Sequence, residues 1–255
     1  MTAPLLECRG LAVGYDTPVL EHIDLRVEPG EILALLGGSG CGKSTLLRTF
    51  TGLLRPLAGE VLLFGQPLHD LSPDDRNRLL RRTGTAFQQD ALFGSMTVGD
   101  NVALPLRQAD VAEPIIREMV AIKLGLVGLA GFERREPASL SGGERKRVAL
   151  ARASILDPDL VFCDEPGAGL DPVVAATIDA TLLRFRAAFG MALVVVSHEL
   201  ESIRALADRA VMFAGGAIVA RGTIDELAVS KDRVVFDFFH RVAGSPGVRA
   251  GNQSR

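Results

Sequence analysis

The chain has 255 residues, of which 47% are hydrophobic and 23% charged, and its formal net charge is −3. This is an ordinary globular composition, with enough apolar material for one large domain or for a core with a smaller subdomain. The slightly acidic balance argues against general nucleic-acid binding. The longest charge-free run, about 12 residues at 187–198, is too short to cross a bilayer.

The N-terminal stretch MTAPLLECRG has no basic region followed by an apolar run, so we do not expect a signal peptide. Three cysteines, Cys8, Cys41 and Cys163, are an odd number without the spacing of a metal site. Such a set is typical of a reducing compartment. We therefore expect a soluble intracellular protein.

The first half of the chain begins with strand patterns. LLECRGLAVGY and VLEHIDLRVEPG alternate apolar and polar residues and end in turn residues, which predicts a pair of strands. EILALLGG then predicts a buried strand, and AGEVLLFGQPL, further on, is another strand pattern. Between them, KSTLLRTFTGLL predicts a helix with Leu46, Leu47, Phe50 and Leu54 on one side.

From about residue 90 to 157 the pattern is helical, most clearly in EPIIREMVAIKLGL and GERKRVALARASILD. Three apolar, β-branched runs follow, LVFCDEP, ALVVVSHE and AVMFAGGAIVARG, with helical stretches between them. Strands that alternate with helices predict an α/β fold whose mainly parallel sheet is covered on both faces. The polar, Gly- and Pro-rich end, 244–255, is expected to be a disordered tail.

The segment GGSGCGKST, residues 37–45, fits the pattern G-x-x-x-x-G-K-[ST] and lies between a predicted strand and a predicted helix. Glycines let backbone N–H groups converge on phosphate oxygens, and the helix start adds its partial positive charge. A glycine-rich turn with an incidental lysine is the alternative, but strand, spacing and helix all agree with a site for a nucleoside triphosphate. The residues expected there are Gly37, Gly38, Ser39, Gly40, Cys41, Gly42, Lys43, Ser44 and Thr45.

Within this segment, Lys43 would reach the β- and γ-phosphates, Ser44 would coordinate Mg²⁺ and Thr45 would contact a phosphate. Asp164 and Glu165 follow four apolar residues at the carboxyl end of a predicted strand, the edge where open α/β sheets bind ligands. Asp164 suits the magnesium shell. Glu165 suits the base that polarises an attacking water, a role worth roughly 10²–10⁴-fold. The alternative for this pair is a solvated turn.

No N-K-x-D string of the kind that reads guanine occurs, which argues against a GTPase. The string LSGGE begins at residue 140, AFQQD at 86, AGLDP at 168 and VVVSHE at 194. With these motifs in this order, the chain resembles the ATP-binding subunits of ABC transporters over roughly residues 5–230. The resemblance implies a P-loop NTPase (RecA-like) core with an N-terminal antiparallel β subdomain and an inserted α-helical signature subdomain at about 90–157, in a domain spanning 1–230.

The resemblance also implies roles for single residues. Tyr15 would stack on adenine, although a strand aromatic that packs in the sheet is the alternative. Gln88 would touch Mg²⁺ and sense the membrane partner, so that Ser44, Gln88 and Asp164 are the expected metal ligands. ATP and Mg²⁺ are the cofactors that these roles require.

The remaining roles concern the γ-phosphate and the second subunit. Ser141, Gly142 and Gly143 would face the γ-phosphate of a nucleotide held mainly by the other subunit, and they begin a predicted helix. Asp171 would communicate across the dimer, and His198 would contact the γ-phosphate and act in catalysis with Glu165. The resemblance thus implies a homodimer with two ATP molecules sandwiched head-to-tail.

Two departures from the usual motifs stand out. Glu144 ends the signature where glutamine is commoner, and AGLD replaces the more usual SALD. Neither change removes a group that contacts phosphate, so we expect activity to survive. Repulsion between Glu144 and the nucleotide is a consequence that the sequence leaves open.

Segment 91–107 is expected to form the groove for a permease helix. Its sequence, together with residues 164–185 and 194–223, is similar to that of ATPases of Mla-type phospholipid transporters. This implies peripheral attachment to the cytoplasmic face of the inner membrane through a permease of the MlaE kind. A periplasmic Mce-domain protein and a small STAS-domain subunit would be further partners, with glycerophospholipid as cargo and no nucleic acid. An ABC importer ATPase for amino acids or another small solute remains an alternative, as does a non-transport ABC ATPase acting on DNA or ribosomes.

Residues 231–243 predict a C-terminal amphipathic helix, with Val235, Phe238, Phe239 and Val242 at helical spacing. This apolar face either packs against the body of its own chain or clasps the second ATPase copy. The sequence leaves both alternatives open.

Overall fold

The structure, a computed structural model, describes residues 3–240. These residues form two compact units, one from 3–70 together with 196–240 and the other from Leu71–Val195. The chain therefore leaves the first unit and returns to it after completing the second. Val242 and the tail expected at 244–255 lie outside the described residues.

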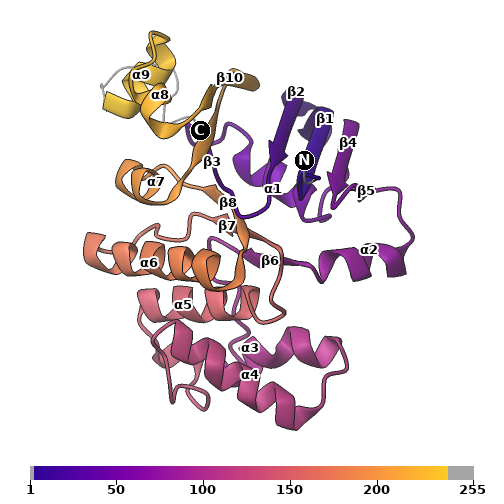
Figure 1. The fold of residues 1–255 in the computed structure, drawn as a ribbon, viewed down its shortest axis with the longest axis vertical. Coiled ribbons are helices and arrows are strands. Elements are labelled where there is room, and N and C mark those ends of the chain that lie inside the picture. Colours follow the sequence, from indigo (N-terminus) through magenta and orange to yellow (C-terminus); the bar gives the residue numbers. More distant parts are fainter. Residues whose placement is uncertain (1–2, 241–255) are drawn as a thin grey trace, which may run out of the picture. The chain divides into compact units, whose positions relative to one another are not determined.

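An antiparallel sheet opens the first unit (Figure 1). Its strand order is β2-β1-β4-β5, with bounds β1 (Leu6–Gly14), β2 (Pro18–Val27), β4 (Ala58–Leu63) and β5 (Gln66–Pro67). Leu6 lies opposite Val27 on one side and Leu63 on the other. The predicted pair of N-terminal strands is confirmed, and it forms the expected antiparallel β subdomain.

The first unit also contains β3 (Ile32–Gly37), β9 (Arg209–Ala214) and β10 (Ala217–Gly222). β3 runs parallel to β9, and β9 turns back into β10 through Gly215 and Gly216, both at positive φ. Every residue of β3 is buried, which is why its sequence is a continuous apolar run instead of an alternating one. The run AVMFAGGAIVARG is thus a hairpin of two strands.

Helix α1 (Lys43–Phe50) follows β3 and is shorter than its apolar pattern predicts. Gly52 adopts a left-handed conformation with φ of 74°, its N–H bonds the carbonyl of Thr49, and the N–H of Leu53 bonds that of Arg48. This pair of bonds closes the helix end as a Schellman motif. Leu54 therefore lies outside the helix, contrary to the prediction.

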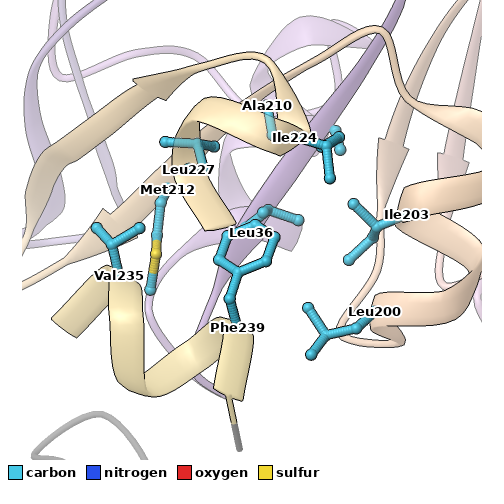
Figure 2. Close-up of a cluster of buried hydrophobic side chains, with 10 residues drawn as sticks. Leu36, Leu200, Ile203, Ala210, Met212, Ile224, Leu227, Val235 and Phe239 are labelled. Atoms are coloured by element: carbon cyan, nitrogen blue, oxygen red, sulfur yellow. The ribbon is translucent and has the colours of Figure 1, made fainter. Parts of the chain in front are cut away.

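The C-terminal helices of the first unit are α7 (Leu200–Leu206), α8 (Ile224–Ala228) and α9 (Arg233–His240). They share one apolar core with β3 and β9, and Figure 2 shows Val235 and Phe239 of α9 directed toward Met212 and Leu36. Val235 is 0% exposed and Phe239 is 3% exposed. The expected amphipathic helix therefore buries these two residues in its own chain and does not offer them to a second copy.

The second unit has three neighbouring strands in the order β8-β7-β6, with bounds β6 (Thr83–Ala86), β7 (Leu160–Asp164) and β8 (Ala192–Val196). β6 and β7 are parallel, with Ala86 opposite Cys163. All residues of β7 and β8 are buried. The predicted parallel strands are confirmed here and for β3 with β9.

The helices of the second unit are α2 (Pro73–Leu80), α3 (Val98–Gln108), α4 (Glu113–Leu126), the short 3₁₀ helix η1 (Pro137–Ser139), α5 (Gly142–Ala153) and α6 (Pro172–Phe189). α3, α4 and α5 pack on one another, and α5 also packs on α6 (Figure 1). The run EPIIREMVAIKLGL coincides with α4. Helix α2 was not predicted from the sequence, although Ser72 caps it and Pro73 begins it, which is a recognisable start signal.

Within residues 3–240, none of the helices is both long enough and apolar enough to span a membrane.

Candidate functional site

The glycine-rich loop after β3 requires glycine at two positions. Gly37 has φ of 147°, and a Cβ there would lie 2.5 Å from the carbonyl oxygen of Phe213. Gly42 has φ of 101°, and a Cβ there would lie 2.8 Å from Leu20. Any side chain at these sites would displace the loop, so glycine is needed to keep its backbone close to β9 and β2.

Lys43 begins α1 and folds back onto this loop. It is 8% exposed, and its Nζ donates to the carbonyl oxygens of Gly37 and Gly38, each at 2.8 Å. Cys41 Sγ lies 3.6 Å from the same Nζ. No carboxylate pairs with this ammonium in the described part of the chain, so its positive charge remains available to an anion at the loop. Ser44, next along α1, is exposed.

Tyr15 lies just beyond the end of β1 and is 59% exposed. It therefore does not pack inside the sheet, which was the alternative considered for it. Its hydroxyl oxygen accepts a hydrogen bond of 2.6 Å from a guanidinium nitrogen of Arg48 on α1. An exposed ring held by its hydroxyl keeps its face open for stacking.

His198 is exposed between β8 and α7, in the segment where Ser197 Oγ accepts from the N–H of Glu199 at 3.1 Å. With Tyr15 and residues 37–45, it completes the expected site residues carried by the first unit. The other expected site residues belong to the second unit.

Asp164 and Glu165 lie at the carboxyl end of β7, as predicted. Asp164 ends the strand and is 9% exposed. Glu165 has φ of 52°, a left-handed conformation that is rare for residues other than glycine and is concentrated at functional sites. The neighbouring Cys163 is fully buried, and burial raises the pKa of its thiol to about 12. Cys163 is therefore an inert core residue.

The signature residues form the start of α5. Ser141 caps the helix, with its Oγ accepting from the N–H of Glu144 at 3.3 Å, while the carboxylate of Glu144 accepts from the N–H of Ser141 at 2.7 Å. This reciprocal capping box lowers the pKa of Glu144 through the hydrogen bond from the Ser141 backbone. The buried Gly143 packs closely on α6, where a Cβ would lie 2.4 Å from Val174.

Gln88 and Asp171 are both exposed in loops of the second unit. Gln88 follows β6, in a segment whose Asp90 and Ala91 have positive φ. Asp171 caps α6, and its carboxylate accepts from the N–H groups of Val173 at 3.1 Å and Val174 at 3.0 Å. Asp171 thus has a local structural role besides the one implied by resemblance.

The structure adds residues that the sequence analysis missed. Arg48 holds Tyr15, and Asn101, which is 0% exposed, bonds the backbone of Phe93, Met96 and Thr97. Lys146 of α5 bonds the carbonyl oxygen of Gln88, and Arg152 of the same helix bonds that of Asp90. The only sequence signal for these last two was the basic run GERKRVALARA, which reads equally well as a solvated helix face.

The expected ligands suit magnesium by type. A hydroxyl from Ser44, an amide oxygen from Gln88 and a carboxylate from Asp164 are hard oxygen donors, and Mg²⁺ is usually held by few carboxylates together with substrate phosphates. Residues 3–240 contain no group of three or more His, Cys, Asp or Glu side chains placed to hold a metal ion. By type alone, the three expected donors fit Mg²⁺.

Comparison with known proteins identifies the family. The family model for ABC transporters matches residues 20–168, which include the phosphate loop, the signature and both carboxylates. This chain belongs to the ABC transporter family. It is an ATPase subunit of that family, with the mixed α/β P-loop fold that the sequence predicted.

Relatives that match this ABC ATPase along most of its chain support the same conclusion. The intermembrane phospholipid transport system ATP-binding protein MlaF of Haemophilus influenzae is 38% identical over 248 residues, covering 96% of this chain and 94% of that protein. MlaF of Escherichia coli K12 is 38% identical and covers 89% of this chain and 85% of that protein. The probable ribonucleotide transport ATP-binding protein mkl of Mycobacterium leprae is 38% identical, covering 92% and 68%.

Solved structures match this ABC ATPase as well. CbiO1 of Clostridium perfringens, part of the ABC transporter complex cbiONQ, has a TM-score of 0.81 at 29% identity, covering 89% of this chain and 92% of that one. The ATP-binding cassette MJ0796, solved as a dimer in a post-hydrolysis state with ADP and Pi, has a TM-score of 0.79 at 28% identity, covering 86% and 98%.

Proposed function

We propose that this ABC ATPase hydrolyses ATP as a homodimer to power phospholipid transport between the inner and outer membranes. Phospholipid is proposed as the cargo because the chain is 38% identical, over 96% of its length, to a protein named for intermembrane phospholipid transport. The dimeric MJ0796 cassette supports the homodimer. Since the chain offers no membrane-spanning helix within 3–240, a separate permease would carry the lipid.

The proposed roles within the site follow from chemistry. The bare loop at 37–42 and the ammonium of Lys43 bind the triphosphate, and Tyr15 stacks on adenine. Ser44, Gln88 and Asp164 would hold Mg²⁺, which supplies charge neutralisation at the β- and γ-phosphates. Positioning and charge neutralisation of this kind account for most of the acceleration of phosphoryl transfer.

The hydrolytic step needs a proton acceptor and a contact to the γ-phosphate. We propose that Glu165 accepts a proton from the attacking water and that His198 donates a hydrogen bond to the γ-phosphate. The N–H groups at the start of α5, around Ser141–Gly143, would bind the γ-phosphate of nucleotide held by the partner, with Asp171 linking the two copies. This role fits Gly143, because its missing side chain lets the helix start pack closely on α6.

The proposed assembly places the chain at the cytoplasmic face of the inner membrane. A permease of the MlaE kind would bind it, with segment 91–107 as the docking region, and an Mce-domain protein and a STAS-domain subunit would complete the complex. Phe87 and Phe93, which flank the start of that segment, are 38% and 50% exposed and provide apolar surface for a permease helix.

The cargo is tested by purifying the chain with its permease and identifying bound lipid by mass spectrometry. We expect glycerophospholipid in the complex and ATP-dependent transfer of labelled phospholipid between vesicles. The matched complex with Glu165→Gln should bind the lipid and fail to move it. Specific binding of an amino acid or a ribonucleotide in place of lipid would favour a solute importer. The relative mkl, whose name describes probable ribonucleotide transport, represents this alternative.

A further inference from the structure

The loop that carries Gln88 is fastened to the signature helix by two basic side chains. The guanidinium of Arg152 on α5 donates to the consecutive carbonyl oxygens of Asp90 at 2.8 Å and Ala91 at 2.7 Å. Lys146, one turn after the start of α5, donates to the carbonyl oxygen of Gln88 itself. All of these residues belong to the second unit.

Charge and burial strengthen this attachment. The carboxylate of Asp90 lies 3.4 Å from Lys146 Nζ and 3.6 Å from the guanidinium of Arg145. The side chains of Lys146 and Asp90 are only 10% and 14% exposed, so water screens this ion pair poorly. Removing one partner of a buried ion pair strongly destabilises the fold around it, because the other charge is left buried without compensation.

The backbone of the loop depends on these contacts. Asp90 and Ala91 have φ of 58° and 50°, a left-handed conformation that is unfavourable for residues with a side chain. Their carbonyl oxygens are the two acceptors of Arg152. Such a conformation persists only where the surroundings hold it, and here Arg152 and Lys146 do so.

We propose that Lys146 and Arg152 are positioning residues that lock the loop at 88–91 to α5, so that Gln88 and the signature at the start of that helix respond to nucleotide as one body. The inference rests on the proposed roles of Gln88 and of Ser141–Gly143. A continuous helix is stiff, so contacts one and three turns from the start of α5 transmit its position to the loop.

Amide hydrogen exchange tests the lock without nucleotide. In Lys146→Met and Arg152→Lys, exchange in peptides covering 87–95 should become roughly 10- to 100-fold faster, the change expected when a hydrogen bond from a charged donor is lost and local opening becomes easier. Lys123→Met is the control, because Lys123 is also buried, at 3% exposed against 8% for Lys146, and is paired with Asp157 elsewhere in the same unit. Its peptides at 87–95 should exchange as in the wild type.

Turnover tests whether the lock serves Gln88. With the full-length chain, Lys146→Met should lower kcat about tenfold or more and raise the Mg²⁺ concentration for half-maximal rate, while binding of a fluorescent ATP analogue changes less than about twofold. Because Lys146 acts through Gln88, adding Lys146→Met to Gln88→Ala should cause no further loss. Full additivity of the two changes, or wild-type exchange at 87–95 in both variants, would overturn the proposal.

Failure of the positioning role can be told apart from failure of the proposed function. If the wild-type chain neither binds nor hydrolyses ATP, the proposed function fails whatever the exchange data show. If the wild type hydrolyses ATP and the Lys146→Met and Lys123→Met variants have equal kcat and equal Mg²⁺ dependence, only the positioning role is rejected.

Discussion

At the scale of single residues, Glu144 shows how a departure from a usual motif can be accommodated. Its carboxylate caps α5 by bonding the Ser141 N–H, and these hydrogen bonds hold its pKa below the usual range. The stabilisation of the start of α5 by this cap is therefore present at neutral pH, and it is lost as the pH falls through the lowered pKa of Glu144. The same negative charge lies at the helix start proposed to receive a phosphate.

We predict that Glu144→Gln strengthens ATP-dependent association of the dimer. Glutamine can form the same capping box but carries no charge, so repulsion toward the γ-phosphate is removed. Removing a half-buried charge of this kind should raise the association constant about two- to fivefold at low salt. The gain should fade in about 0.5 M NaCl. Association is measured by light scattering against ATP concentration. Glu118→Gln, the same charge change on the exposed part of α4, should have no effect, and equal behaviour of the two variants would contradict the assignment.

Motif residues and supporting residues differ in how far the sequence indicates them. Lys43, Asp164 and Glu165 were predictable, because phosphate and metal chemistry allows few residue types at fixed spacings. Arg48, Asn101 and Arg152 were not, because an arginine or asparagine on a helix is usually solvated. Only the fold shows that Asn101 is fully buried and that its side chain is bonded to four backbone groups.

At the scale of elements, the contact of α5 with α6 depends on a missing side chain. A Cβ on Gly143 would lie 2.4 Å from Val174 Cγ1, far inside normal contact distance. Gly143→Ala should therefore lower the unfolding free energy by about 1–3 kcal/mol, the usual cost of overpacking, and displace the signature. Val174→Ala removes the clashing methyl group, so the double variant should recover most of the lost stability.

Thermal melts and ATPase rates check this prediction. Gly142→Ala is the control for stability, because its Cβ would meet Leu170 at 3.4 Å, an ordinary contact. A Gly143→Ala protein that is as stable as Gly142→Ala, or a double variant that recovers nothing, would show that the clash is relieved in another way.

Helix α9 is an integral part of the core of its unit. Phe239 is 3% exposed and packs among Leu36, Met212 and Leu227 (Figure 2), so Phe239→Ala should cost about 3–5 kcal/mol of unfolding free energy. Urea unfolding measures this loss. Phe236→Ala on the same helix is the control, since Phe236 is 43% exposed and stacks only on His240 among the described aromatic rings, so it should cost below about 1 kcal/mol. Equal losses would place α9 outside the core.

At the scale of the whole molecule, the proposed dimer forms around ATP. Glu165→Gln should bind ATP without cleaving it, and the mass in solution should then rise from 27.1 kDa to twice that value when ATP is added. Light scattering on a size-exclusion column measures the change. Adding Lys43→Met to this variant removes the phosphate contact and should leave a monomer. A Glu165→Gln protein that binds ATP and stays monomeric would refute the dimeric mechanism.

The sequence by itself determined the family, the P-loop fold and the order of motifs, because nucleotide chemistry ties residue type to spacing along the chain. It also predicted most strands, from alternation in β1 and β2 and from continuous buried apolar runs in β3, β7 and β8. Only the tertiary structure decided that α1 ends at Phe50, that Tyr15 is exposed, and that the apolar face of α9 is buried in its own unit. These outcomes depend on which distant residues come into contact, and a local pattern of apolar and polar residues does not encode its partner.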